Sequence, residues 1–203
     1  MNDIQINILT RTGRRERLYK ILENTINNQT YKNIRHIKSC DNPNCNFLNH
    51  NKDTIMVSKN KSAGNGFYNL YLNSLVDSVQ NGWVIILDDD AKLCDNTFIE
   101  RLVDVCKNTT KDNVIIYQTY LWPKKVLFPP NNLMKKKTFK PCKIDMSCFC
   151  IHHSALKKYR FDGKRMGDFR LLNNIRNDGK MKFKYVDLKP GIWANYEGQL
   201  FGA

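Results

Sequence analysis

Hydrophobic residues recur along this chain in two patterns. Short apolar runs, which are typical of strands buried in a sheet, alternate with segments in which apolar residues return every three or four positions, which is typical of amphipathic helices. The strand-like segments are 4–10, 34–40, 54–57, 83–87, 114–118, 144–152 and 182–187. The helix-like segments are 15–27, 67–79, 97–107 and 168–176.

This alternation predicts the fold class. Strand–helix–strand units connect by right-handed crossovers, so their strands lie parallel and their helices cover both faces of the sheet. We therefore predict an α/β fold, a single domain over residues 1–203 with a mainly parallel central sheet and helices on both faces. The second half is less regular, and residues 120–141 have a loop-like composition that includes a lysine triplet.

The composition narrows the class of protein. A chain of 203 residues with 41% hydrophobic residues can bury a core without cross-links. No apolar run approaches the roughly 18 residues of a membrane helix, and the amino terminus lacks the basic and apolar regions of a signal peptide. We therefore predict a soluble, cytoplasmic protein without a membrane span.

The seven cysteines are an odd number and follow no familiar disulfide framework, which favours a reducing compartment and unpaired thiols. A zinc site built from the cysteines and histidines of segment 142–153 is the alternative. Strand alternation argues against that site, because it points His153 away from Cys148 and Cys150. Buried cysteines usually pack as small hydrophobic residues.

The chain is strongly basic. It has 33 Lys and Arg residues against 19 Asp and Glu residues, a formal net charge of +14. This charge implies an anionic partner, which could be nucleic acid, a membrane surface or a phosphorylated small molecule. The chain lacks any recognised aromatic–basic motif of nucleic-acid-binding modules, which argues against nucleic acid.

Three consecutive carboxylates, Asp88, Asp89 and Asp90, follow the apolar segment 83–87. Ligands of open α/β sheets bind just beyond the carboxyl ends of such buried strands. Packed carboxylates raise one another's energy unless a cation lies between them, and oxygen ligands suit Mg²⁺ or Mn²⁺ better than zinc. The alternative is an acidic turn that caps the next helix.

Other polar residues at strand ends could bind an anionic ligand. Arg11 and Arg14, at the first strand-to-helix junction, can meet phosphate through charge-assisted hydrogen bonds, whereas we expect Arg15 and Arg17 on the surface. Asp41, after the second strand, either accepts a hydrogen bond from a nucleoside or serves a turn.

Four segments together carry a resemblance to a known family. They are Ile8-Leu9-Thr10-Arg11-Thr12, Ser39-Cys40-Asp41, Leu87-Asp88-Asp89-Asp90-Ala91-Lys92-Leu93 and Gly167-Asp168-Phe169-Arg170-Leu171-Leu172. Their order resembles the GT-A fold of nucleotide-sugar glycosyltransferases, particularly the inverting group called family 2, whose acidic motif is written D-x-D. Compact enzymes of this kind occur in large DNA viruses of algae and protists, and an Asn- and Lys-rich chain would suit such a source, with the host cytoplasm as its location.

The resemblance implies a role for each residue. It gives residues 1–93 as the nucleotide-binding half and residues 94–203 as the acceptor-side half. Asp88 and Asp90 would hold Mn²⁺ or Mg²⁺, and Asp88 or Asp89 would take the ribose hydroxyls. The expected contacts with the nucleotide-sugar are Thr10, Arg11, Thr12, Arg14, Asp41, Lys61, Asp88 and Asp89.

Asp168 is the expected general base of an inverting displacement, in which one carboxylate takes the proton of the acceptor hydroxyl. Its alternative role is a helix cap. Gly167 stands where the family often has Glu, and the basic motif of processive synthases is absent, which argues against a processive enzyme. Asp145, His152 and His153 are further candidates for the base.

These observations predict a metal-dependent, inverting, non-processive glycosyltransferase. It would move a sugar from a nucleotide-diphosphate donor, UDP-sugar above others, to a glycan, glycoprotein or other hydroxyl acceptor. Tyr120, Trp122 and Trp193 could stack on acceptor sugars or pack in the core. The rival predictions are a nucleotidyltransferase, which normally has a glycine-rich first loop, and a basic nucleic-acid-binding domain.

Overall fold

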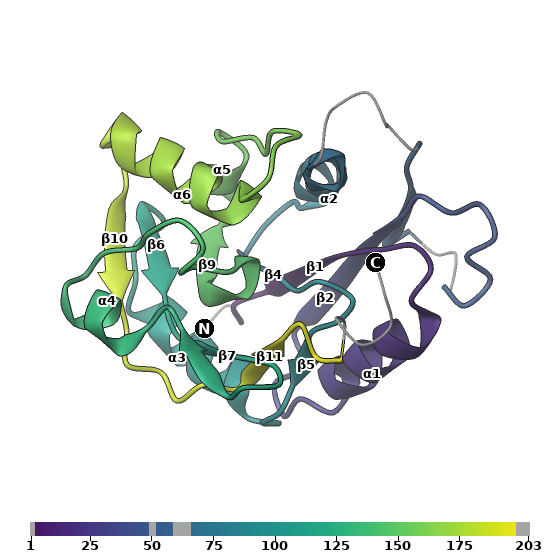
Figure 1. Ribbon diagram of the computed structural model, residues 1–203, viewed down its shortest axis with the longest axis horizontal. Coiled ribbons are helices and arrows are strands. Elements are labelled where there is room, and N and C mark those ends of the chain that lie inside the picture. Colours follow the sequence, from purple (N-terminus) through teal and green to yellow (C-terminus); the bar gives the residue numbers. More distant parts are fainter. Residues whose placement is uncertain (1–2, 49–51, 59–65, 198–203) are drawn as a thin grey trace.

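The apolar runs of the sequence form a seven-stranded central sheet (Figure 1). The computed structural model describes residues 3–48, 52–58 and 66–197. The strand order across the sheet is β10-β6-β9-β4-β1-β2-β3. The bounds are β1 Ile6–Thr12, β2 Ile34–Cys40, β3 Thr54–Met56, β4 Trp83–Ile86, β6 Asn113–Ile116, β9 Phe149–His152 and β10 Lys182–Tyr185.

The sheet is mainly parallel, as predicted. Strand β1 pairs in parallel with β2 and β4, β2 pairs in parallel with β3, and β10 with β6. The exception is β9, which runs antiparallel between β4 and β6. Because β1, β2 and β4 are parallel neighbours, their carboxyl ends meet at one edge, and the loops that follow them lie close together.

Helices cover both faces of the sheet, also as predicted (Figure 1). One face packs against α1 (Glu16–Asn27) and α3 (Phe98–Lys107), and the other packs against α2 (Leu70–Ser78), α5 (His153–Leu156) and α6 (Gly167–Asp178). Strands β1, β2, β4, β6 and β9 supply both cores, because alternate side chains point to opposite faces.

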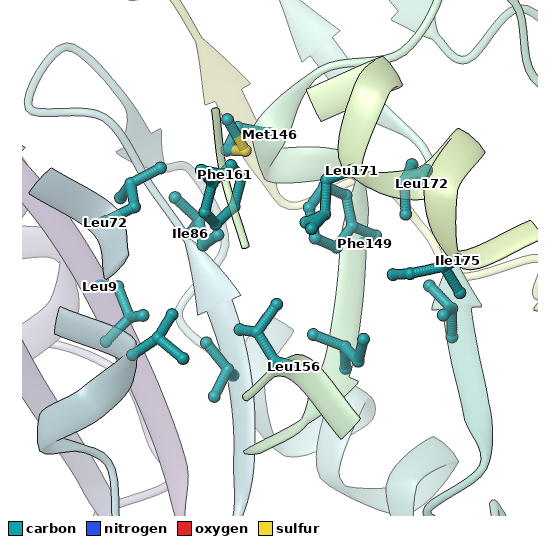
Figure 2. Close-up of a cluster of buried hydrophobic side chains, with 14 of the residues drawn as sticks. Leu9, Leu72, Ile86, Met146, Phe149, Leu156, Phe161, Leu171, Leu172 and Ile175 are labelled. Atoms are coloured by element: carbon teal, nitrogen blue, oxygen red, sulfur yellow. The ribbon is translucent and has the colours of Figure 1, made fainter. Parts of the chain in front are cut away.

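The alternation is visible in β4, whose neighbours Ile85 and Ile86 enter different cores. Figure 2 shows Ile86 and Leu9 among the helical side chains of the α2, α5 and α6 core, with Leu72 and Leu156 nearby. Both strand residues are fully buried. The two cores fix the sheet, and with it the positions of the loops at its carboxyl edge.

A second, four-stranded sheet lies beside the first. Its order is β5-β11-β7-β8, with β5 Lys92–Leu93, β7 Thr119–Leu121, β8 Val126–Phe128 and β11 Ile192–Ala194. The prediction that residues 120–141 form a loop was therefore wrong, since this segment also holds α4 (Asn131–Lys135). Strands of two or three residues are too short to show a period in the sequence.

The structure corrects two predictions about the cysteines. Cys40 and Cys45 form a disulfide, so the expectation of unpaired thiols was wrong for these two. In β9, Cys150 packs in the α1 and α3 core while Phe149 and Ile151 face the opposite core, as strand alternation predicted. Cys148 was expected on the same face as Cys150, but it packs in the opposite core because residues 146–148 form a 3₁₀ turn and not a strand. Within the described segments no helix is long and apolar enough to cross a membrane.

Candidate functional site

The acidic triplet lies in the turn after β4, at the carboxyl edge of the sheet. The Leu87 N–H donates a hydrogen bond to the Leu9 carbonyl, which ties the start of this turn to β1. The turn is tight, because the Ala91 N–H donates to the Asp88 carbonyl at 2.8 Å. Asp89 and Asp90 are buried, whereas the Asp88 side chain is 28% exposed. Asp88 is therefore the member of the triplet most open to a ligand.

Arg11, near the end of β1, is fully engaged with this turn. Its Nε and Nη2 atoms donate to the two carboxylate oxygens of Asp88 at 2.8 and 2.9 Å, which is a bidentate pair. Its Nη1 donates to Asn69 Oδ1 at 2.6 Å, and its Cζ lies 4.4 Å from the ring centroid of Tyr68. Arg11 was predicted to meet phosphate, whereas in this structure it orients the Asp88 carboxylate.

Arg15 is a site residue that sequence analysis placed on the surface. Its guanidinium pairs with Asp89 and, at 2.6 Å, with Asp90. Thr12 supports the same cluster, because its hydroxyl donates to Asp89 Oδ2 at 2.8 Å. A buried carboxylate needs a positively charged partner. Three consecutive carboxylates in the sequence could therefore have indicated that a second arginine lies beside them. Arg17 is a surface residue as expected, 61% exposed and paired with Glu197.

The charges of this cluster are not fully balanced. Three carboxylates face two guanidinium groups, Arg11 and Arg15. Burial, and then the neighbouring Asp88, raise the pKa of Asp90 to about 6, and Arg15 offsets only part of this effect. Burial also raises the pKa of Asp89. An additional cation at this point would stabilise the ionised carboxylates.

Asn69 connects the acidic cluster to the start of α6. It is buried at the end of a 3₁₀ turn (Phe67–Asn69), and its amide nitrogen donates to the Lys164 carbonyl at 2.8 Å. A Cβ at Gly167 would lie 2.6 Å from that amide nitrogen. Glycine at 167, where the resembling family often has Glu, is thus required by the close approach of Asn69.

Asp168 occupies the first turn of α6. Burial, and then the negative charge of Asp145, raise its pKa to about 7, with Asp88 adding to the effect. The Phe169 N–H donates to Asp168 Oδ1 at 2.7 Å. A carboxyl group with this pKa is half ionised near neutral pH, which is the property that a general base needs.

Asp145 is the second carboxylate of this region and precedes β9. Its Oδ1 accepts hydrogen bonds from the backbone N–H and the hydroxyl of Ser147, at 2.9 and 2.6 Å. These bonds hold it in place beside Asp168. The two histidines considered as alternative bases lie elsewhere. His152 is the strand partner of Trp83, at the opposite end of β4, and His153 Nδ1 is hydrogen-bonded to the Gly82 carbonyl. The structure therefore excludes both histidines from this site.

An open cleft of about 570 Å³ lies at the ends of β1, β2 and β3. It brings together Arg14 and Asp41, two of the residues predicted to contact the nucleotide. The Tyr71 hydroxyl donates to Asp41 Oδ2 at 3.2 Å, and a Cβ at Gly13 would lie 2.8 Å from Asp41 Oδ1. Glycine at 13 therefore leaves room for the Asp41 carboxylate. The cleft is lined by Arg14, Asp41, Asn42, Pro43, Met56, Val57 and Ser58.

Two further predicted contacts have different outcomes. Thr10 is fully buried and its hydroxyl lies 3.0 Å from His36 Nε2, so the structure gives it a packing role instead of a ligand contact. Burial lowers the pKa of His36 to about 3, which keeps this imidazole neutral. Lys61 lies outside the described residues, and its role stays a prediction.

The donor atoms around Asp88 and Asp90 fit a hard divalent cation, since both groups are carboxylates and the cluster has an excess of negative charge. In the described part of the chain, no three His, Cys, Asp or Glu side chains are grouped closely enough to hold a metal by themselves. A cation at the triplet would therefore need further oxygen ligands, from a bound diphosphate or from water.

Comparison with solved structures shows the class of fold. S. aureus TarS matches with a TM-score of 0.70 and 11% identity over 94% of this chain and 36% of that chain. TarS 1–349 in complex with UDP matches at 0.70 and 12% identity, over 94% and 60% of the two chains, and its complex with UDP-GlcNAc at 0.63 and 12%, over 94% and 58%. The fold is therefore GT-A-like, and this chain spans 36% to 60% of the length of these structures. No family model and no curated protein sequence matches the chain.

Proposed function

We propose that this protein is a metal-dependent, inverting glycosyltransferase that uses a UDP-sugar donor. The observation that carries the proposal is the convergence, at the carboxyl edge of a GT-A-like sheet, of a paired acidic triplet and a carboxylate with a pKa near 7. TarS structures of the same fold contain UDP and UDP-GlcNAc. The cleft that holds Arg14 and Asp41 would take the nucleoside and its first phosphate.

The donor would be held by residues of the first half of the chain. Asp41 accepts a hydrogen bond from the uracil imide or a ribose hydroxyl, and exposed Arg14 approaches phosphate. Arg11 orients Asp88, and Arg15 pairs with Asp89 and Asp90. Asp88 and Asp90 are the residues that would hold Mg²⁺ or Mn²⁺, which offsets the charge that develops on a departing diphosphate.

Asp168 would act as the general base. An acceptor hydroxyl attacks the anomeric carbon, its proton passes to the Asp168 carboxylate, the new glycosidic bond forms, and the bond from the anomeric carbon to the diphosphate oxygen breaks. UDP leaves with the bonding electron pair. Asp145 contributes by raising the proton affinity of Asp168, because two nearby carboxylates resist simultaneous ionisation.

A nucleotide-sugar panel tests this proposal most broadly. The protein should be stabilised against heat by UDP and by at least one UDP-sugar when Mn²⁺ is present, because a ligand that binds only the folded state raises the melting temperature. Slow release of UDP from that UDP-sugar would report transfer to water. If UDP, GDP, CDP and their sugars all leave the melting temperature unchanged, with and without metal, the proposal is wrong.

A further inference from the structure

A row of four aromatic side chains crosses the second sheet. The ring centroids are 5.2 Å apart for Tyr120 and Trp193, 5.2 Å for Trp193 and Trp122, and 4.9 Å for Trp122 and Tyr196. The row spans two strands, because Trp193 of β11 pairs with Tyr120 of β7. All four residues are half-buried, so the row is not enclosed in the core.

The aromatic row runs from an open cleft to the acidic triplet. One end forms the wall of an open cleft of about 550 Å³, which is large enough for part of an oligosaccharide. The other end adjoins the acidic triplet, because the Tyr196 N–H donates a hydrogen bond to the Asp90 carbonyl. The cleft is lined by Cys94, Asp95, Tyr120, Lys125, Lys189, Pro190 and Trp193.

Lysines accompany the aromatic row along its length. Lys125 Nζ lies 5.8 Å from the ring centroid of Trp193, and Lys92 Nζ lies 4.8 Å from that of Tyr196. Lys189 also lines the cleft. The carboxylate in the cleft lining, Asp95, is paired with Arg101 at 2.9 Å. The surface beside the rings is thus positively charged.

We propose that the aromatic row and its lysines bind the acceptor, and that the acceptor is an oligosaccharide of uronic acids. This inference rests on the proposed function. A pyranose ring packs its apolar C–H face on an aromatic ring, and a uronate carries its carboxylate directly on that ring. The ammonium groups of Lys92 and Lys125, 4.8 and 5.8 Å from the ring centroids of Tyr196 and Trp193, would then meet the carboxylates of the stacked sugars. The row would guide the chain end toward Asp90.

The rival ligands differ in chemistry. A neutral oligosaccharide would stack equally well but would leave the lysines without an ionic partner. A phosphodiester-linked sugar polymer would place its charges between the rings instead of on them. Binding of tetragalacturonate, maltotetraose and a sugar-phosphate oligomer of similar length therefore separates the three possibilities.

Calorimetry with tetragalacturonate, in the absence of nucleotide and metal, tests the site apart from catalysis. We expect Lys125→Ala/Lys189→Ala to weaken binding by about fivefold, as for a pair of exposed ion pairs, and Trp193→Ala by about tenfold or more. The matched control is Lys157→Ala/Lys158→Ala, an exposed pair that directly follows α5. Helix α5 packs on the face of the central sheet opposite to β5 and β11, so this variant should bind normally.

Three results would overturn the proposal: no binding of tetragalacturonate, equal affinity in the Lys125→Ala/Lys189→Ala and control variants, or tighter binding of either rival oligosaccharide. Because Trp193→Ala could disturb β11, Trp193→Phe, which keeps a stacking ring, should retain most of the affinity. UDP binding measured on the same samples reports the proposed function separately. Normal UDP binding without uronate binding would reject the acceptor site and leave the donor site intact.

Discussion

Two effects raise the pKa of Asp168: its burial and the negative charge of Asp145. We expect Asp168→Asn to preserve donor binding while transfer falls by roughly 10² to 10⁴, the usual contribution of a positioned base. In the unsubstituted protein, the pH dependence of transfer should have an acidic limb near 7, where this carboxyl group loses its proton. Near-normal transfer by Asp168→Asn would assign the residue to helix capping and turn attention to Asp145.

The same group affects stability. Because its pKa in the folded state, about 7, lies above its ordinary value of 3.8, the folded state holds the proton more tightly than the unfolded state. The protonated carboxyl group therefore favours folding at low pH, and this contribution is lost as the pH rises from about 4 to 7. Melting temperatures of the unsubstituted protein and Asp168→Asn should diverge over this range, with the Asn variant relatively more stable above pH 7. A constant difference would contradict a raised pKa.

Gly13 tests the nucleoside contact without removing a polar group. Alanine at this position would place its Cβ 2.8 Å from Asp41 Oδ1, and a side-chain oxygen can move aside at little cost to folding. We expect Gly13→Ala to keep its melting temperature and to lose affinity for both uridine and UDP, as Asp41→Ala should. Unchanged affinity in both variants would remove Asp41 from the donor site.

The side-chain amide of Asn69 connects the start of helix α6 to the acidic triplet. Gly167→Ala would push against the Asn69 amide, which holds Arg11 and hence Asp88. We expect a loss of transfer in this variant. Gly179→Ala, at the other end of α6, is the control. The backbone of Gly179 is left-handed, so this substitution should lower the free energy of unfolding by about 1 kcal/mol. No atom lies near the new Cβ, so we expect no effect on the site. Equal effects of the two variants on kcat would exclude the coupling.

The elements that the sequence predicted well are those with long periodic patterns. Strand β2 matches its expected range of 34–40, and α3 differs from 97–107 by one residue, because seven to eleven residues are enough to show a period. Strand β9 was predicted only in part, since residues 146–148 form a 3₁₀ turn. The second sheet was missed altogether, because its strands depend on partners far along the chain.

The parallel sheet explains why residues far apart in the sequence could be assigned to one site. Arg11 and Asp88 were both expected to contact the nucleotide-sugar from strand ends, and the shared edge of the sheet brings their side chains within 2.8 Å of each other. Which arginine turns inward could not be predicted, because Arg14 and Arg15 are adjacent in one loop and only the fold sends Arg15 to Asp89 and Asp90.

The central claim is that the acidic triplet holds a divalent cation together with a nucleotide diphosphate. Calorimetry of UDP binding, with Mn²⁺ and with EDTA, tests it in the unsubstituted protein and in Asp90→Asn. Our account predicts clear binding with Mn²⁺, a loss of affinity in EDTA, and weak binding under both conditions for Asp90→Asn. Equal UDP affinity with Mn²⁺ and with EDTA would contradict it, and would leave exposed Arg14 as the group that meets the diphosphate.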